Sequence, residues 1–296
     1  MAEESKKARR DFARETARIM REEEAKRRRR NRIITQVSVV LGAVAVALVI
    51  VLIVQSSIKP PVAGPDNMAS DGILLTGDGT GEIVAVQNEG IPIDGKPTPT
   101  NPDDYADTVN IVMYVDYMCP ICGLFEKTNA ETIGTWVSQG LATVEYHPIA
   151  ILNGRSQGTD YSSRAASAAA CVADYQPDSF FQANAALFSN QPTEGTSGLT
   201  NEEIASVVAQ VGVTDVDAVK CITDERYKQW ADDATERTKS AIPNSDLDGV
   251  GGTPTVIVNG KQYTGNPDDA EAFQAFVSEI GLELTGDDGD AELETE

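Results

Sequence analysis

The chain has 296 residues, of which 41% are hydrophobic and 24% are charged, and its formal net charge at pH 7 is −22. This length allows one large domain or two small ones. The charge is unevenly placed, because residues 1–32 carry 13 Lys and Arg against 7 Asp and Glu, whereas the rest carries 11 against 39. The acidic remainder argues against nucleic acid or anionic lipid as the partner of the globular part.

Residues 33–54 form an uncharged, apolar run that we expect to be a transmembrane helix. At about 1.5 Å per residue, this run matches the roughly 30 Å hydrocarbon core of a bilayer. A cleaved secretory signal is the competing interpretation, but the run exceeds the usual ~7–15 residues of a signal, and no clear cleavage site follows it in residues 55–60. A buried core helix would need a domain large enough to cover it on all sides.

The residues before this run indicate its orientation. Four arginines, Arg27 to Arg30, and then Arg32 directly precede it. Basic flanks stay on the cytoplasmic side of a membrane. We therefore expect a single-pass protein of the cell membrane, with residues 1–32 as a basic cytoplasmic tail and the C-terminal bulk outside the cytoplasm.

Residues 55–107 are rich in Pro, Gly and Asp, which is typical of a linker. We expect an extracytoplasmic spacer here, in which residues 81–86 are a candidate short strand. The glycine-rich residues 77–81 are not a phosphate loop, because they lack the Lys-Ser/Thr ending of that motif.

Residues 108–159 predict a strand, a helix and a second strand. Residues 109–115 are β-branched and aromatic, as in a strand that is buried on both faces of a mixed sheet. The helix is predicted to begin at Pro120, where a missing N–H costs little, and to stop near Gly140. Residues 142–150 predict the second strand, which Pro148 should break or place at a sheet edge.

Residues 160–241 change to Ala-rich, helix-forming sequence and predict a helical insertion. Thr200 and Glu203 match a capping box, in which each residue satisfies a backbone N–H of the other. The predicted helices are residues 162–171, 179–189, a helix that starts at Thr200, 215–222 and 225–240.

Residues 242–282 complete the α/β domain. Residues 253–263 predict a β-hairpin, because Asn259-Gly260 is a strong turn signal, and residues 268–280 predict a last helix. Residues 283–296 form an acidic tail that we expect to be disordered. The expected fold class is α/β, with one mixed sheet interrupted by a helical insertion and preceded by a single transmembrane helix.

Cys119 and Cys122 are the residues with the clearest chemistry. They stand three positions apart, with Cys119 at the predicted helix start. Free N–H groups and the helix dipole stabilise a thiolate there, so that Cys119 can exchange disulfides while Cys122 resolves them. A zinc site uses the same spacing but needs two further ligands, and none stand at close spacing. A purely structural disulfide over so short a loop constrains the unfolded chain little.

Two motifs flank the insertion, Val115-Asp116-Tyr117-Met118-Cys119-Pro120-Ile121-Cys122 and Gly251-Gly252-Thr253-Pro254-Thr255-Val256-Ile257-Val258-Asn259-Gly260. Together they resemble the DsbA-like branch of the thioredoxin superfamily, in the membrane-anchored form common in Gram-positive envelopes. The resemblance covers residues from about 108 to 282 and implies a thioredoxin-like mixed sheet. It also implies that Cys119 is the nucleophile, that Cys122 resolves, and that Thr253-Pro254 is a cis peptide facing the pair and binding substrate. A strand-initiating proline is the alternative for Pro254.

The chain departs from this family at two places. Strongly oxidising members have a histidine between the cysteines, where this chain has Pro120 and Ile121, so the Cys119 thiolate is expected to be less stabilised. Many members carry a buried acid six residues before the first cysteine, where this chain has Met113. Asp116 or a water would then have to move protons for Cys122.

Cys171 and Cys221 lie fifty positions apart in the insertion of an exported domain, and we expect them to pair. Related actinobacterial proteins resemble this chain in having such a bond. Closing this loop stabilises a fold by about 4 kcal/mol in the chain-entropy model. A second redox pair that shuttles electrons is the alternative. His147, the single histidine, is interpreted as a structural or surface residue rather than a base.

The resemblance implies a thiol–disulfide oxidoreductase that oxidises cysteine pairs of unfolded exported proteins. It also implies a membrane quinone-linked thiol oxidase as the partner that reoxidises the enzyme. A disulfide isomerase or reductase is the close alternative, and a non-catalytic module that binds unfolded proteins is a further one. We expect no metal and no bound cofactor.

Overall fold

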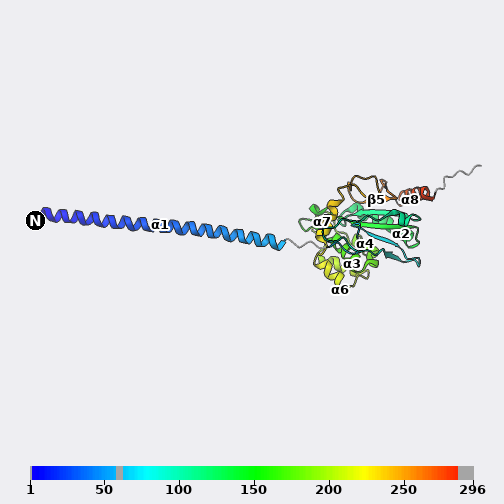
Figure 1. The fold of residues 1–296 in the computed structure, drawn as a ribbon, viewed down its shortest axis with the longest axis horizontal. Coiled ribbons are helices and arrows are strands. Elements are labelled where there is room, and N and C mark those ends of the chain that lie inside the picture. Colours follow the sequence, from blue (N-terminus) through cyan, green and yellow to red (C-terminus); the bar gives the residue numbers. More distant parts are fainter. Residues whose placement is uncertain (1, 58–62, 286–296) are drawn as a thin grey trace, which may run out of the picture. The chain divides into compact units, whose positions relative to one another are not determined.

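The structure, a computed structural model, describes the backbone of residues 2–57 and 63–285 and the side chains of residues 14–51 and 63–281. The chain divides into two compact units, Met1–Pro60 and Pro61–Glu296. The first unit holds one long helix, and the second holds the sheet and the other helices that the structure describes (Figure 1).

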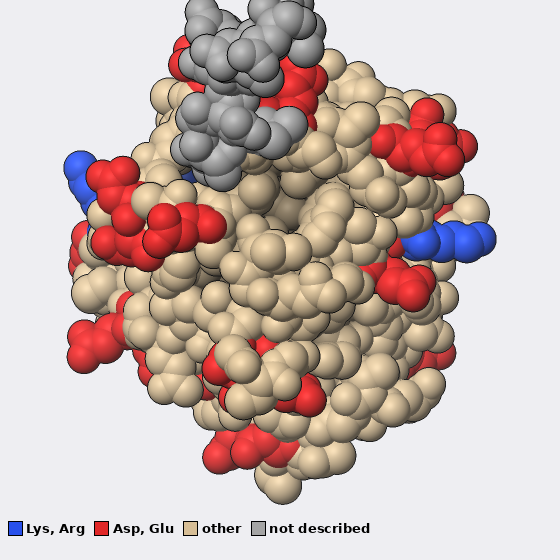
Figure 2. Space-filling model, turned by 90° about the vertical axis from the view of Figure 1, so that its right-hand side faces the viewer, with Lys and Arg blue, Asp and Glu red and all other residues tan. Residues whose placement is uncertain are grey.

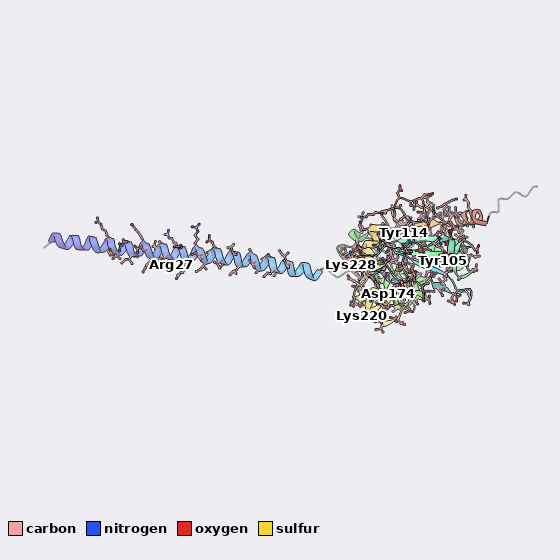
Figure 3. All side chains as sticks on the ribbon, in the orientation of Figure 1. Arg27, Tyr105, Tyr114, Asp174, Lys220 and Lys228 are labelled. Atoms are coloured by element: carbon pink, nitrogen blue, oxygen red, sulfur yellow. A yellow bond between two sulfur atoms is a disulfide. The ribbon has the colours of Figure 1, made fainter. Side chains whose placement is uncertain are left out.

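The first unit is the helix α1, Ala2–Ser57, which contains both the basic tail and the apolar run. Arg27 lies on this helix (Figure 3), ahead of the apolar residues. The described side chains of α1 are exposed, including large apolar ones such as Val39 and Leu41. Apolar side chains all round a helix are typical of a membrane span. The helix is long and apolar enough to cross a membrane, which confirms the expected single N-terminal apolar helix.

The second unit is built on a six-stranded mixed sheet with the strand order β2-β1-β4-β3-β5-β6. Strands β3 and β4 run parallel, and the other neighbouring pairs run antiparallel. At the centre of the sheet, Val112 stands opposite both Glu145 and Ile257. The strands are β1 Ile73–Gly77, β2 Ile83–Ala85, β3 Val109–Val115, β4 Ala142–Pro148, β5 Thr255–Val258 and β6 Lys261–Gln262.

The predicted succession of strand, helix and strand is confirmed. Parallel strands need a crossover connection, and α2, Pro120–Ser138, provides it between β3 and β4. Pro148 does not place β4 at a sheet edge, because β4 lies between β1 and β3, but the strand ends at Pro148 and not at residue 150, which agrees with the alternative that Pro148 breaks it. Pro148 is the last residue of β4, where a missing N–H donor removes little of the ladder.

The segment expected to be mostly a spacer, residues 55–107, needs correction. Its residues from 63 on are described, and they contribute β1 as well as the anticipated short strand β2 to the sheet. The apolar residues of β1 pair with β4, which a composition rich in Pro, Gly and Asp did not reveal. Asp71, just before β1, is also held by a bidentate ion pair with Arg237, at 2.6 and 2.7 Å.

The insertion, residues 160–241, is described throughout and contains helices but no strand, as predicted. The capping box at the start of α5 is present, with Thr200 accepting from the Glu203 N–H and Glu203 accepting from the Thr200 N–H. The helices are α3 Tyr161–Tyr175, α4 Phe180–Ser189, α5 Asn201–Ala209, α6 Val216–Thr223 and α7 Lys228–Arg237. Short 3₁₀ turns lie at Pro102–Tyr105, Asn153–Arg155 and Pro177–Ser179.

The chain returns to the sheet through the predicted hairpin. Asn259 and Gly260 form its turn with positive φ angles of 45° and 83°, which suits an Asn-Gly turn. The last helix, α8 Ala270–Thr285, packs on α2 through an edge-to-face contact of Phe273 and Phe125, with ring centroids 5.1 Å apart. Residues 283–285, the start of the predicted acidic tail, belong to α8, and the rest of that tail, from 286 on, lies outside the described residues.

Acidic side chains are spread over the face that Figure 2 shows, with few basic ones among them. This distribution agrees with the acidic composition of the chain beyond residue 32. Like charges at the surface favour solubility and disfavour contact with anionic polymers.

Candidate active site

Cys119 occupies the N-cap of α2, and Pro120 is at the helix start. Strand β3 ends at Val115 and α2 begins at Pro120, so the turn of residues 116–119 connects the two and ends with Cys119. The Cys119 N–H donates to the Asp116 carbonyl (2.9 Å), and the Cys119 carbonyl accepts from the Gly123 N–H (3.2 Å). Both Cys119 and Cys122 are free thiols.

The structure brings the second motif to the first cysteine. Cys119 Sγ donates to the carbonyl oxygen of Thr253 at 3.1 Å, across 134 positions of sequence. The Thr253-Pro254 peptide bond is cis. The structure therefore brings together the four residues predicted for this site from the sequence, which are Cys119, Cys122, Thr253 and Pro254.

The two thiols differ in their acidity. The pKa of Cys119 is lowered to about 6, first by the hydrogen bond from the Cys122 thiol and also by the N–H groups of Ile121 and Cys122. Cys122 is fully buried, and this burial raises the pKa of its thiol well above the ordinary value, an effect to which Cys119 adds. At neutral pH the reduced Cys119 is therefore mostly a thiolate, which accepts from the Cys122 thiol and no longer donates to the Thr253 carbonyl, whereas Cys122 stays protonated.

The carboxylate of Asp116 is buried and holds the turn together. It accepts hydrogen bonds from the N–H groups of Met118 (2.8 Å) and Leu152 (2.9 Å) and from the Ser162 hydroxyl (2.7 Å). Burial raises the pKa of this carboxyl group despite these donors. These bonds indicate that Asp116 has a structural role, because they hold the turn in place. They do not support the expected role of Asp116 in moving protons for Cys122.

Glu126 is a buried acid that the sequence analysis did not single out. It follows Cys122 by one turn of α2, and burial raises the pKa of its carboxyl group to about 7. Glu126 Oε1 accepts from Asn184 Nδ2 (3.2 Å), and Asn184 Oδ1 accepts from the Tyr117 hydroxyl (2.9 Å). Residues four apart share a helix face. The spacing of four positions between Cys122 and Glu126 could therefore have predicted from the sequence that Glu126 lies on the same face of α2 as Cys122.

Polar side chains of the insertion also contact the turn of residues 116–119. Ser162 and Asn184 bond to side chains of this turn. Gln191, just after α4, donates from its Nε2 to two backbone carbonyls of the turn. No local pattern marks these residues, because the packing of the insertion brings them there from distant positions.

The other residues considered in the sequence lie away from this turn. Cys171 on α3 and Cys221 on α6 form a disulfide bond of 2.01 Å. His147 is buried on β4, where it pairs with Glu145 (3.2 Å) and stacks on the Tyr114 ring with centroids 4.5 Å apart. This environment agrees with a structural interpretation of His147.

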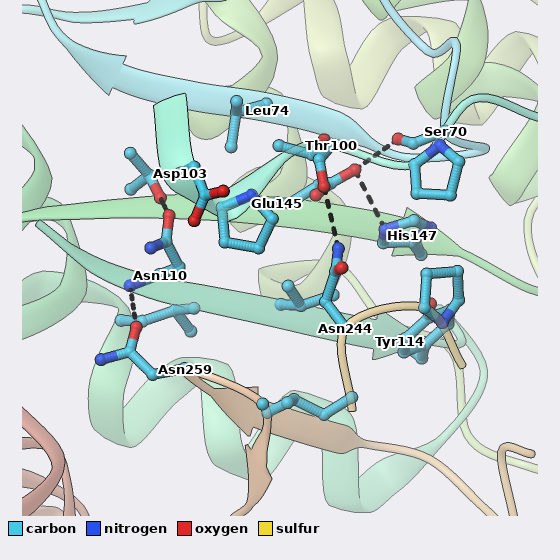
Figure 4. A pocket seen from close by; sticks show the side chains of 18 of the residues that line it. Ser70, Leu74, Thr100, Asp103, Asn110, Tyr114, Glu145, His147, Asn244 and Asn259 are labelled. Atoms are coloured by element: carbon cyan, nitrogen blue, oxygen red, sulfur yellow. Dashed lines mark hydrogen bonds and ion pairs between the residues drawn. The ribbon is translucent and has the colours of Figure 1, made fainter. Parts of the chain in front are cut away.

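A cavity of about 300 Å³ lies beside the Glu145–His147 pair. Its polar groups bond to one another (Figure 4), since Glu145 also accepts from Ser70 and Thr143 donates to Asn110 (2.9 Å). Neither Cys119 nor Cys122 lines it. The cavity is thus separate from the cysteine site.

The chain is similar to known proteins in both sequence and fold. The thioredoxin family profile matches residues 105–279. DsbA from Mycobacterium tuberculosis in its reduced form is 28% identical, with a TM-score of 0.53, and the match covers 73% of this chain and 93% of that one. DsbG from the same organism is 29% identical, with a TM-score of 0.54, and the match covers 76% of this chain and 90% of that one.

A further relative is the serine/threonine-protein kinase PknE of Mycobacterium tuberculosis. It is 32% identical over 177 residues, which are 58% of this chain. The match spans only 29% of the kinase's length. The similarity therefore concerns a segment of that protein and not the whole.

Proposed function

The chain belongs to the thioredoxin family, and we propose that it is an extracytoplasmic thiol oxidase that introduces disulfide bonds into unfolded exported proteins. The expected likeness to DsbA-like proteins is confirmed by the family match and by the mycobacterial thiol–disulfide oxidoreductases that share its fold. The observation that carries the proposal is the unequal pair at the start of α2, an acidic Cys119 beside a buried Cys122.

The proposed reaction begins with the Cys119–Cys122 disulfide. A substrate thiolate attacks Cys119 Sγ, a mixed disulfide forms, and the electron pair of the broken bond goes to Cys122, which takes a proton because the pKa of its thiol is high. The second substrate thiolate then attacks the substrate sulfur of the mixed disulfide. Cys119 leaves as a thiolate, so one of the two substrate protons remains in solution at neutral pH.

The acidity of Cys119 supports the oxidising direction. A leaving thiol of low pKa leaves faster, and stabilising the reduced form makes the disulfide a stronger oxidant. A pKa of about 6 lies between the values of about 7 for thioredoxin and about 3.5 for DsbA. We therefore expect an oxidant weaker than the histidine-containing members of the family.

The surface beside the pair suits an unfolded substrate. Ile121 and Leu124, near the start of α2, are exposed by 47% and 36%. Apolar side chains around a reactive sulfur favour contact with the apolar segments that an unfolded chain displays. Thr253-Pro254 is proposed to bind the substrate backbone.

We further propose that α1 anchors the enzyme in the cell membrane, with its basic N-terminus in the cytoplasm and the cysteine pair outside. A quinone-linked thiol oxidase of the membrane would then return Cys119 and Cys122 to the disulfide. Labelling of intact cells with a thiol reagent that does not cross membranes tests this topology. Labelling of reduced Cys119 only after cell lysis would contradict it.

The direction of the reaction is tested by two measurements on the full chain. One is the thiol count of protein taken directly from its membrane, and the other is the equilibrium constant of the pair against glutathione. A mostly oxidised pair that is more oxidising than thioredoxin supports the oxidase. A mostly reduced pair with a thioredoxin-like potential would instead indicate the isomerase or reductase.

Catalysis is separated from simple binding by Cys119→Ala. This variant should fail to oxidise a reduced test protein, because no Cys119–Cys122 disulfide can form to accept the two electrons of the substrate thiols. Retained oxidation would overturn the assignment of Cys119. Protection of an unfolded protein from aggregation, measured in parallel, reports the binding function independently of redox turnover.

A further inference from the structure

We propose that Gln191 is a positioning residue through which the helical insertion sets the redox properties of the cysteine pair. This inference rests on the proposed redox role of Cys119 and Cys122. Gln191 follows the C-terminus of α4, and its Nε2 donates to the carbonyl oxygen of Tyr117 at 3.0 Å and to that of Cys119 at 2.9 Å. Both bonds go to backbone carbonyls and neither goes to a sulfur, so Gln191 would act on Cys119 through the backbone.

The other end of the Gln191 amide lies against the first turn of α2. A Cβ atom built on Gly123 would meet Gln191 Oε1 at 2.5 Å, closer than such contacts occur. The side-chain amide therefore lies across the backbone of Gly123 while it donates to the turn before the helix. Glycine leaves the space that this arrangement needs.

Gln191 is itself held in place by the insertion. Its N–H donates to the Phe188 carbonyl at 3.1 Å. The Phe188 ring packs on the Tyr117 ring, with centroids 4.8 Å apart. A ring contact and two side-chain hydrogen bonds thus join the end of α4 to the turn that carries Cys119.

These contacts have a chemical consequence at the sulfur. The Gln191 amide bonds to the carbonyls of Tyr117 and Cys119, so it limits movement of the backbone before and after Cys119. Fixing the Cys119 carbonyl also fixes the peptide planes at the helix start, whose N–H groups stabilise the thiolate. Loss of the Gln191 amide should make the thiolate less stable and the disulfide a weaker oxidant.

The first test is Gln191→Ala in the full chain, purified in detergent. A net hydrogen bond of about 0.5–1.5 kcal/mol corresponds to roughly a twofold to tenfold change in an equilibrium constant. We expect the equilibrium with glutathione to shift by this factor toward the Cys119–Cys122 disulfide. The ultraviolet absorbance of the thiolate against pH should show a higher pKa for Cys119.

The matched control is Gln176→Ala. Gln176 is also a glutamine of the insertion with several bonds, since its Nε2 donates to the Gly212 carbonyl (2.8 Å) and its Oε1 accepts from the Thr214 N–H (3.1 Å). These partners are not part of the active-site turn. Gln176→Ala should lower the melting temperature without changing the glutathione equilibrium, whereas Gln191→Ala should change both.

A second variant approaches the same contact from the other side. Gly123→Ala favours the helix but displaces the Gln191 amide, so it should shift the glutathione equilibrium in the same direction as Gln191→Ala. In the Gln191→Ala background, Gly123→Ala should have no further effect on this equilibrium. Equal effects of Gly123→Ala in both backgrounds would show that the contact does not set the potential.

A purely structural role of Gln191 and a lack of oxidase activity would be seen in different measurements. If Gln191→Ala and Gln176→Ala both lower stability and leave the glutathione equilibrium at the wild-type value, Gln191 is only structural, whatever the enzyme does. If wild-type protein exchanges with glutathione but oxidises no reduced test protein, the proposed oxidase function fails. The shift caused by Gln191→Ala is still measurable in that case.

Discussion

The two cysteine pairs of this protein lie in different regions and differ in what surrounds them. Cys171 and Cys221 are joined by a disulfide between two helices of the insertion, whereas Cys119 and Cys122 are free thiols at the start of α2. Burial does not separate them, because all four residues are at most 6% exposed. What differs is the supply of hydrogen-bond donors, since the first turn of a helix has N–H groups without intrahelical partners.

This difference supports disulfide exchange as the proposed role of Cys119 and Cys122 and stabilisation as that of Cys171 and Cys221. The Cys119 sulfur faces N–H groups and a neighbouring thiol that stabilise its negative charge. Cys171 lies in the middle of α3 among buried alanines such as Ala168 and Ala170, where the backbone N–H groups are already bonded within the helix.

The largest effect is expected from Cys122→Ala. Without Cys122, the proposed resolving thiol, Cys119 cannot form the internal disulfide that oxidises a substrate, although its thiolate can still attack a disulfide bond of another protein and form a mixed disulfide with one of its sulfurs. Complete oxidation of a reduced test protein should fall by at least about a hundredfold. After incubation with the oxidised test protein, the Cys119 thiolate attacks a disulfide bond of that protein and releases its other sulfur as a thiolate, so non-reducing electrophoresis should show a trapped mixed disulfide. Fast oxidation of the reduced test protein by this variant would contradict separate roles for the two thiols.

Removing the second pair with Cys171→Ala/Cys221→Ala should act on stability instead. The bond closes a loop between residues fifty positions apart, which corresponds to about 4 kcal/mol of unfolding free energy in the chain-entropy model. Denaturant unfolding measures this loss. The glutathione equilibrium of Cys119 and Cys122 should stay at its wild-type value, and a large change there would support the second redox pair.

Glu126→Gln should have a smaller effect that depends on pH. The pKa of Glu126 is about 7 in the folded chain and about 4.5 when unfolded, so the fold loses stability as pH rises from about 4.5 to 7. Glutamine removes this loss and should stabilise the protein by about 3 kcal/mol at pH 8 and by little at pH 4.5. Melting curves at both pH values measure the difference.

The exposed Glu131, on the same helix, provides the control for this prediction. Glu131→Gln should leave the stability nearly unchanged at both pH values, because an exposed carboxylate is solvated in either state. An equal gain from both variants would point to net charge rather than to the burial of Glu126.

The smallest effect concerns the pH dependence of Cys119 alkylation in the reduced protein. Only the thiolate reacts, so the rate should be half-maximal near pH 6, where the pKa of Cys119 lies, and should fall about tenfold per unit below it. Cys122→Ala should move the midpoint upward, because the Cys122 thiol is the main cause of the lowered pKa. A midpoint near 9 in wild type would mean that the helix start does not activate Cys119.

Local sequence patterns predicted much of the fold. The strand at residues 109–115, the capping box at Thr200 and the hairpin turn at Asn259-Gly260 were found where expected. Each depends on residues within a few positions of one another, and short-range geometry decides such elements. Strand β1 was not predicted from local patterns, because its pairing with β4 joins residues about seventy positions apart.

By itself, the sequence determined the apolar N-terminal helix, the mixed α/β domain with its insertion and the position of the cysteine pair, because periodicity, capping residues and spacing are local properties. Only the tertiary structure decided what surrounds that pair. Thr253, just before the neighbouring strand β5, contacts the Cys119 sulfur, and Gln191 contacts the turn from the insertion. Contacts between such distant positions depend on how whole elements pack, and the pKa of a thiol depends on those contacts.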